Sequence, residues 1–285
     1  MLYQILVLVI TLDFLFEVRS ETKKQNLSTP FVTVSPITGF FMIEDTPATF
    51  VGTNSLFLAQ FADAFSRNDL FQRMNENNMT LLRLWAFSDG NFCPSDNWNG
   101  QNYFQCWNNS TSSIYINETA LALHLDTTLA EAGIAGIRVI LSLTNNWPAY
   151  GGIPAYISWR IAAAAAGVAS PYSFPGFHDD FYGEDVLKSY YKTWIQTLTE
   201  RKNTISGVFY KDDPTILAWE LGNEIACQGA SETYPCIVNG TSPLMRSWIS
   251  EMSTFIKSLD PNHLVTIGEF DILHVILQCV LKYRF

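Results

Sequence analysis

The sequence predicts an α/β fold, a parallel sheet covered by helices, on the scale of one α/β barrel. Short β-branched or apolar runs alternate with amphipathic helical patterns along the chain, which is the order of βα units. The length of 285 residues would be nearly filled by one barrel of roughly 250 residues. Hydrophobic residues make up 48% and charged residues only 15%, which is typical of a well-packed globular protein.

Five segments have the composition of buried strands. A closed barrel of this kind contains eight strands, so these segments correspond to about the first five βα units. The expected strands cover residues 50–54, 81–87, 137–143, 216–221 and 264–268.

Helices are predicted between the strands, where apolar residues recur at three- and four-residue steps and give each helix one face to cover the sheet. An Asp-Pro-Asn sequence at residues 260–262 ends the last helix, and the alanine run at residues 162–166 predicts a further short helix. The apolar positions are Val186, Tyr190, Trp194 and Leu198 in one helix, and Met245, Trp248, Ile249, Met252, Phe255, Ile256 and Leu259 in the other.

The two ends of the chain differ from its middle, residues 21–270. Residues 1–20 are interpreted as a signal peptide, because their apolar run at residues 5–12 is shorter than the ~20 residues that span a bilayer; an N-terminal anchor is the alternative. Residues 271–285 form an apolar tail without turn signals. This tail resembles read-through past a coding segment, and the alternative is a C-terminal helix.

Several sequence features predict secretion. Glycosylation acceptors matter only in the secretory path, and clusters of them in polar stretches indicate outer loops. In an oxidising compartment, close cysteine pairs would staple loops. We therefore predict the disulfides Cys93–Cys106 and Cys227–Cys236, although spacing alone does not exclude other pairings, and Cys279 is left over. The acceptors are Asn26, Asn78, Asn108, Asn109, Asn117 and Asn239.

The formal net charge of -10 argues against nucleic acid or an anionic membrane as a partner, because both would repel an acidic protein. The four histidines have no ligand spacing, and no glycine-rich phosphate loop follows a strand. We expect no metal and no organic cofactor. A monomer that acts on a neutral substrate fits these features.

The motif DDPTILAWELGNEIAC carries the strongest chemical signal. Its strand delivers Asn223 and Glu224 to the carboxyl edge of the sheet, where barrel active sites lie. A carboxylic acid there can protonate a leaving glycosidic oxygen, and an adjacent amide can donate to a sugar hydroxyl. The alternative is that Asn223 and Glu224 only cap the following segment.

Five segments spread over residues 31–270 resemble glycoside hydrolase family 5, and specifically its eukaryotic-type endo-β-1,4-mannanases. They are FVGTNSLFL, LLRLWAFSDG, RVILSLTNNWPAYGG, DDPTILAWELGNE and SLDPNHLVTIGEF. The resemblance implies a TIM (β/α)8 barrel and retaining hydrolysis of internal β-1,4-mannosidic bonds in mannan, galactomannan and glucomannan. It implies that Glu224 is the acid/base, that Asn223 binds the sugar, and that Arg83 supports the nucleophile.

Trp85, Asn146 and Trp147 fall at strand ends in segments that match the substrate cleft of the family. Aromatic faces pack against pyranose rings, so tryptophan suits a neutral polysaccharide. Each residue taken singly is also compatible with the core. Trp147 is the better platform candidate of the two tryptophans, because it lies in the loop-like sequence NNWPAYGG.

A retaining mechanism needs a second carboxylate roughly 5–5.5 Å from the first. The resemblance places this nucleophile on the seventh strand, for which the chain has no matching residue. Glu269 belongs to the fifth strand and is not assigned that role. The alternatives to a mannanase are therefore an inactive truncated product, a glycan-binding remnant, or a β-1,4-glucanase of the same family.

Overall fold

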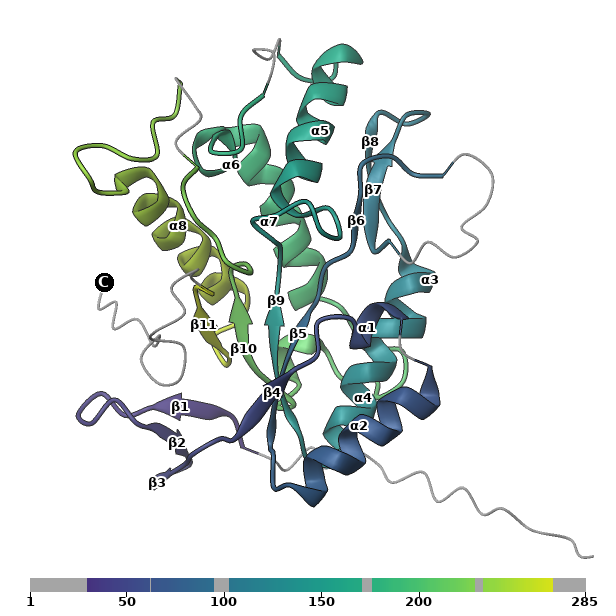
Figure 1. Ribbon diagram of the computed structural model, residues 1–285, viewed down its shortest axis with the longest axis vertical. Coiled ribbons are helices and arrows are strands. Elements are labelled where there is room, and N and C mark those ends of the chain that lie inside the picture. Colours follow the sequence, from purple (N-terminus) through teal and green to yellow (C-terminus); the bar gives the residue numbers. More distant parts are fainter. Residues whose placement is uncertain (1–29, 62, 95–102, 171–175, 229–232, 269–285) are drawn as a thin grey trace, which may run out of the picture.

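The computed structural model describes residues 30–61, 63–94, 103–170, 176–228 and 233–268 (Figure 1). The predicted signal peptide, the sequon at Asn26, Glu269, Cys279 and the tail lie outside the described residues.

A five-stranded parallel sheet forms the centre of the fold, in the order β11-β10-β9-β5-β4. All five predicted strands are present, and each is one or two residues shorter than expected. Since the strands are parallel, their carboxyl ends lie at one edge, toward the top of Figure 1. The strands are β4 (Gly52–Asn54), β5 (Leu81–Trp85), β9 (Arg138–Ser142), β10 (Ile216–Glu220) and β11 (Leu264–Thr266).

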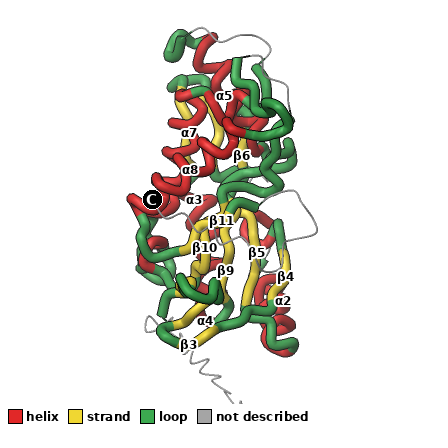
Figure 2. The backbone as a smooth tube through the Cα atoms, turned by 90° about the vertical axis from the view of Figure 1, so that its left-hand side faces the viewer, coloured by secondary structure: helices red, strands yellow, loops and turns green. Residues whose placement is uncertain are grey.

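Helices follow the strands along the chain and pack around them (Figure 2). The longer helices are α2 (Ala64–Glu76), α4 (Thr127–Ala135), α5 (Gly152–Ala165), α7 (Asp185–Thr199) and α8 (Pro243–Leu259). The shorter ones are α1 (Leu58–Phe61), α3 (Glu118–Ala120), the π-helix η1 (Leu121–Asp126), α6 (Asp180–Gly183) and the 3-10 helix η2 (Tyr210–Asp212). The alanine run is the last turn of α5, not a separate short helix.

The main core lies between the helices and the sheet. Trp248 of α8 stacks on Tyr191 of α7 with ring centroids 5.4 Å apart, and the predicted apolar face of α8 is confirmed. On α7 the prediction is partly wrong, because Leu187 and Tyr191 are fully buried where Val186 and Tyr190 were expected. The face is turned by one residue because these two side chains pack into the core shared with α5, α6 and α8.

An antiparallel sheet that the sequence did not reveal lies near the opposite, amino-terminal edge of the strands. It consists of β1 (Val32–Val34), β2 (Phe41–Ile43) and β3 (Thr46–Pro47). Val32 packs against Leu217 and Ala218 of β10 in a second, smaller core. The sheet therefore covers apolar side chains of the parallel strands that the helices do not reach.

A third sheet lies above the carboxyl edge and is stapled by a disulfide. Its strands are β6 (Asp89–Gly90), β7 (Gln105–Asn108) and β8 (Ser113–Ile116). Both predicted pairings are present: Cys93 is joined to Cys106, with Cα atoms 5.1 Å apart, and Cys227 to Cys236, with Cα atoms 5.6 Å apart.

The sequons do not all lie on the outside. Asn78, Asn109 and Asn239 are exposed and Asn108 is half-buried. Asn117 is only 8% exposed, and its side chain accepts a hydrogen bond from the Ala120 amide as the cap of α3. The expectation that Asn117 lies in an outer loop is therefore wrong. No helix in the described ranges is long and apolar enough to cross a membrane.

Candidate active site

The segment after β10 is held against the segment after β9. The backbone N–H of Asn223 donates to the backbone carbonyl of Thr144 at 2.8 Å, and the backbone N–H of Asn146 donates to the backbone carbonyl of Asn223 at 3.0 Å. At Gly222 an added Cβ would lie 2.6 Å from Ile225 Cγ2 and 2.9 Å from Thr144 Cγ2, so any larger residue would force these side chains to shift. The pairing continues the sheet beyond its last strand residues and places Glu224 at the carboxyl edge.

Arg83 of β5 forms an ion pair with Glu220, the last residue of β10. Its Nε donates to Glu220 Oε2 at 2.7 Å and its Nη2 to Oε1 at 2.5 Å, in the two-pronged geometry that favours arginine. The same Nη2 donates to Asn223 Oδ1 at 2.8 Å. The Glu220 side chain is 5% exposed, so the guanidinium compensates a carboxylate that water scarcely reaches.

The orientation of the Asn223 amide follows from that contact. Because its oxygen accepts from Arg83, its nitrogen faces Asn145 and donates to Oδ1 at 2.9 Å. Three strand ends, those of β5, β9 and β10, thus share one hydrogen-bonded network. Its polar groups are fixed before any ligand arrives, which lowers the cost of ordering them on binding.

Glu224 differs from Glu220 in its surroundings. It is half-buried, its backbone is left-handed with φ of 55°, and its Oε2 accepts a hydrogen bond from the indole Nε1 of Trp147 at 2.6 Å. The Trp147 side chain is 41% exposed. Glu224 is therefore the carboxylate of this edge that lies beside an accessible aromatic face, whereas Glu220 is engaged with Arg83.

An aromatic cluster joins the end of β5 to Tyr150, in the loop that also carries Trp147. Trp85 stacks on Phe87, with ring centroids 4.9 Å apart, and contacts Tyr150 and Phe57 edge-on. Phe57 is exposed, whereas Trp85 is only 5% exposed. The cluster extends the apolar lining of the edge from β5 to the loop after β9.

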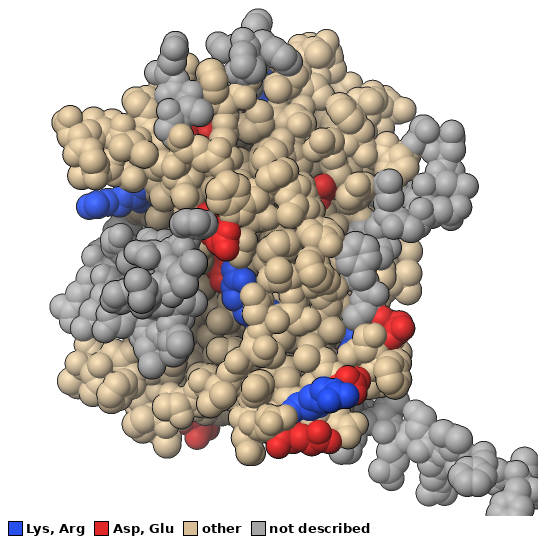
Figure 3. Space-filling view, viewed as in Figure 1, with Lys and Arg blue, Asp and Glu red and all other residues tan. Residues whose placement is uncertain are grey.

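The face of the molecule that carries this edge is mostly uncharged, with acidic and basic atoms next to each other near its centre (Figure 3). Within the described residues, no group of three or more His, Cys, Asp or Glu side chains gathers as metal ligands would. Proton transfer by a carboxyl group, rather than charge attraction over a wide surface, is the chemistry that this arrangement supports.

Comparison with known proteins decides the family. The family model described as glycoside hydrolase family 5, β-mannosidase-like, matches residues 57–274, which is more than half of the chain. The chain belongs to this family.

Relatives of this family 5 chain include mannan endo-1,4-β-mannosidase 1 of Oryza sativa subsp. japonica, 36% identical over 232 residues, which are 80% of this chain and 46% of that protein. Mannan endo-1,4-β-mannosidase F of Aspergillus clavatus is 32% identical over 230 residues, 80% of this chain and 45% of that protein. The chain spans about half the length of the curated relatives it matches.

The crystal structure of the endo-1,4-β-mannanase from Rhizomucor miehei superimposes on the family 5 chain with a TM-score of 0.68 and 32% identity, over 84% of this chain and 60% of that one. The predicted barrel class is confirmed. The described residues of the family 5 chain form about five of the eight βα units that a closed barrel contains.

The structure brings together most of the site residues expected in this family 5 chain. Arg83, Asn223, Trp147 and Glu224 lie on one edge. Trp85 is close to them but nearly covered, which leaves little of its indole for a sugar. Asn146 is 1% exposed and uses its side chain to accept from the Ala226 amide at 3.1 Å, so it holds the Glu224 segment in place.

Sequence reasoning missed two carboxylate- or amide-bearing members of the site, Glu220 and Asn145. A signal for Glu220 was available. Arg83 and Glu220 are single charges within apolar strands, in LLRLW and ILAWE, which flank β9 on its two sides, and opposite charges buried in one sheet are expected to pair.

Proposed function

We propose that this protein hydrolyses internal β-1,4-mannosidic bonds of mannan, galactomannan and glucomannan with retention of anomeric configuration, and that Glu224 is its general acid/base. The observation that carries the proposal is the Trp147–Glu224 hydrogen bond at the carboxyl edge, next to the Arg83–Glu220–Asn223 network. The named activities of the rice and Aspergillus clavatus relatives point to the same substrate class.

In this mechanism Glu224 first donates a proton to the glycosidic oxygen as the bond to the anomeric carbon breaks. A second carboxylate, roughly 5–5.5 Å away, attacks that carbon. Glu224 then takes a proton from the water that releases the sugar. We assign the attacking role to none of the described carboxylates, since Glu220 is held by Arg83 and the resemblance places the nucleophile on the seventh strand. The mechanism therefore requires a chain that includes that strand, and the activity tests use such a chain.

The neighbours of Glu224 suit this role. The Trp147 indole N–H fixes the direction of the carboxyl group and offers its ring face to a pyranose. Asn223 lies beside it with an amide whose orientation is set by Arg83, as a donor to a sugar hydroxyl requires. The mostly uncharged face fits a neutral polymer.

Substrate and stereochemistry can be tested together. We expect the protein to cleave mannan and to leave carboxymethyl-cellulose largely intact, with the β-anomer as first product by proton NMR. Faster cleavage of the cellulose derivative would favour a β-1,4-glucanase, and an α-anomer as first product would exclude the retaining mechanism. Binding of mannan without cleavage would favour a glycan-binding protein.

We further propose that the protein is a secreted, glycosylated monomer. Three exposed sequons, Asn78, Asn109 and Asn239, and two disulfides support this proposal. A eukaryotic cell that expresses the protein should release it into the culture medium, and the mass of the released protein should fall on glycosidase treatment. An unchanged mass would contradict glycosylation.

A further inference from the structure

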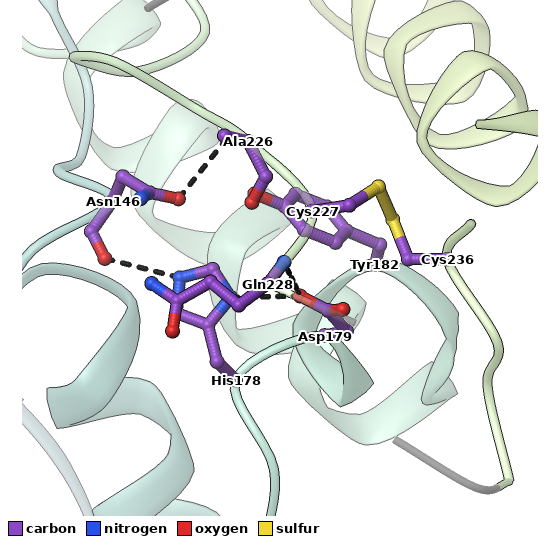
Figure 4. The surroundings of a disulfide bond; sticks show 8 residues. All are labelled: Asn146, His178, Asp179, Tyr182, Ala226, Cys227, Gln228 and Cys236. Carbon is purple, nitrogen blue, oxygen red and sulfur yellow. Dashed lines mark hydrogen bonds and ion pairs between the residues drawn. A yellow bond between two sulfur atoms is a disulfide. The ribbon is translucent and has the colours of Figure 1, made fainter. Parts of the chain in front are cut away.

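The short segment that enters α6 contacts both loops that carry the Trp147–Glu224 hydrogen bond. His178 and Asp179 stand directly before α6 and belong to neither β9 nor β10. Both side chains are buried, with Asp179 fully inaccessible and the His178 side chain 9% exposed. Figure 4 shows them between Asn146 on one side and residues Ala226 to Gln228 on the other.

His178 connects this segment to the loop after β9. Its Nε2 lies 3.0 Å from the Asn146 carbonyl oxygen, and its Nδ1 lies 3.0 Å from Asp179 Oδ1 (Figure 4). Both neighbours are acceptors, so the ring contacts this segment and the Asn146 backbone through its two nitrogens. Asn146 directly precedes Trp147, so His178 holds the backbone from which the indole projects.

Asp179 connects the same segment to the loop after β10. Its Oδ1 also accepts from the backbone N–H of Gln228 at 2.8 Å. Ala226, two residues after Glu224, makes two further hydrogen bonds. Its backbone N–H donates to Asn146 Oδ1 at 3.1 Å, and its carbonyl accepts from the Tyr182 hydroxyl at 3.3 Å. The Cys227–Cys236 disulfide lies between these two contact points.

The loop after β9 and the loop after β10 are therefore both held by the same segment, His178 and Asp179. A left-handed residue such as Glu224, with φ of 55°, keeps that conformation only where the surrounding contacts impose it. The contacts at Ala226 and Gln228 impose it from the carboxyl side, and the pairing of Asn223 imposes it from the other.

We propose that His178 and Asp179 are positioning residues that set the geometry of the Trp147–Glu224 hydrogen bond, an inference that rests on the acid/base role proposed for Glu224. They touch no reacting atom. They act by fixing the two backbone segments from which the indole and the carboxyl group project.

The test uses the indole N–H signal of Trp147 in the ¹⁵N–¹H spectrum of the intact protein, because that signal reports the hydrogen bond without requiring turnover. Trp147→Phe identifies the signal, and Glu224→Ala gives its position without the acceptor. We expect His178→Phe, which keeps a ring but loses both ring nitrogens, to move the signal most of the way to the Glu224→Ala position. His178→Gln, which keeps one donor, should move it less.

The matched control is His124→Gln, because His124 is a half-buried histidine of η1. This variant should leave the Trp147 signal unchanged. A folded His178→Phe protein with the Trp147 signal at its wild-type position would overturn the proposal. Should His178→Phe unfold, with all indole signals collapsed, Asp179→Asn is judged by the same criterion.

An activity readout then separates positioning from general damage. Proton donation matters most for poor leaving groups, so His178→Phe should slow mannan cleavage far more than cleavage of a dinitrophenyl mannoside. Equal losses on both substrates would contradict positioning of the acid. A moved indole signal in a protein without mannanase activity would sink the proposed function and leave the structural role of His178 standing.

Discussion

At the scale of single residues, the carboxyl edge separates two glutamates by their partners. Glu220 is ion-paired and buried, and Glu224 faces an exposed indole. Arg83 therefore matters to stability as well as to the site, because removing one partner of a buried pair leaves an uncompensated charge.

Arg83→Met should destabilise the protein by about 3 kcal/mol or more, the usual cost of breaking a buried ion pair. Urea unfolding measures this change. Adding Glu220→Gln should recover part of the loss, since the remaining side chain is then neutral. A double variant no more stable than Arg83→Met alone would show that the charge of Glu220 is not the cause.

Asp89 is a second buried carboxyl group, located behind the loop of Trp147. Its backbone amide donates to the Tyr150 carbonyl at 2.8 Å, and Gln105 Nε2 donates to its Oδ1 at 2.8 Å. Burial raises the pKa of Asp89 to about 8, although hydrogen bonds from Gln105 and the Gly152 backbone oppose the shift. The folded protein thus holds a proton there that the unfolded chain has lost above its ordinary pKa of 3.8.

Stability should consequently fall as pH rises from about 4 to about 8, by about 1.4 kcal/mol per pH unit from this group alone. Asp89→Asn keeps the shape and removes this dependence, so its melting temperature should vary less between pH 5 and 8. Asp185→Asn is the control, because Lys188 lowers the pKa of that exposed group out of the window. Equal pH slopes for Asp89→Asn and the wild type would contradict the assignment.

At the scale of elements, one carboxylate joins α8 to two strands. Asp260, which ends α8, accepts from Trp219 Nε1 of β10 at 2.7 Å and from His263 Nδ1 at 2.6 Å. The His263 Nε2 lies 2.9 Å from the Asp213 carbonyl. The Asp-Pro-Asn sequence correctly predicted the end of the helix, but its partner Trp219 lies 41 positions earlier and left no local signal.

Asp260→Ala should lower the free energy of unfolding by about 2–4 kcal/mol, because buried donors on Trp219 and His263 lose their acceptor. Asp212→Ala, on the surface turn η2, should change stability far less. Thermal and urea unfolding compare the two variants. An Asp260→Ala protein as stable as the Asp212→Ala control would refute this link.

At the scale of the whole molecule, the five strands of the parallel sheet were predictable and the strands of the two smaller sheets were not. The three-residue strands β4 and β11 were found because each lies within a longer apolar run, residues 50–54 and 264–268. The strands β5, β9 and β10 carry their own apolar signal. The strands of the β1–β3 and β6–β8 sheets are two to four residues long, too short for a period to show.

The same limit applies to the site. Asn223 and Glu224 are neighbours in one motif, and Trp147 lies in a loop with its own turn signals. The pairing of Arg83 with Glu220 spans 137 positions, and the contact of His178 with Asn146 depends on how two loops fold together. Such contacts are properties of the assembled barrel edge and not of any one segment.

The central claim, that Glu224 is the acid/base, is tested most directly by turnover of Glu224→Ala on a dinitrophenyl mannoside, whose leaving group departs without a proton, with and without azide. Loss of a general acid/base lowers kcat by about 10²- to 10⁴-fold. Azide, which needs no base to attack a glycosyl-enzyme, should restore turnover and yield a mannosyl azide of retained configuration. The exposed Glu200→Gln, at the end of α7, should behave as wild type. Full activity of Glu224→Ala, or a loss that azide does not relieve, would contradict the account.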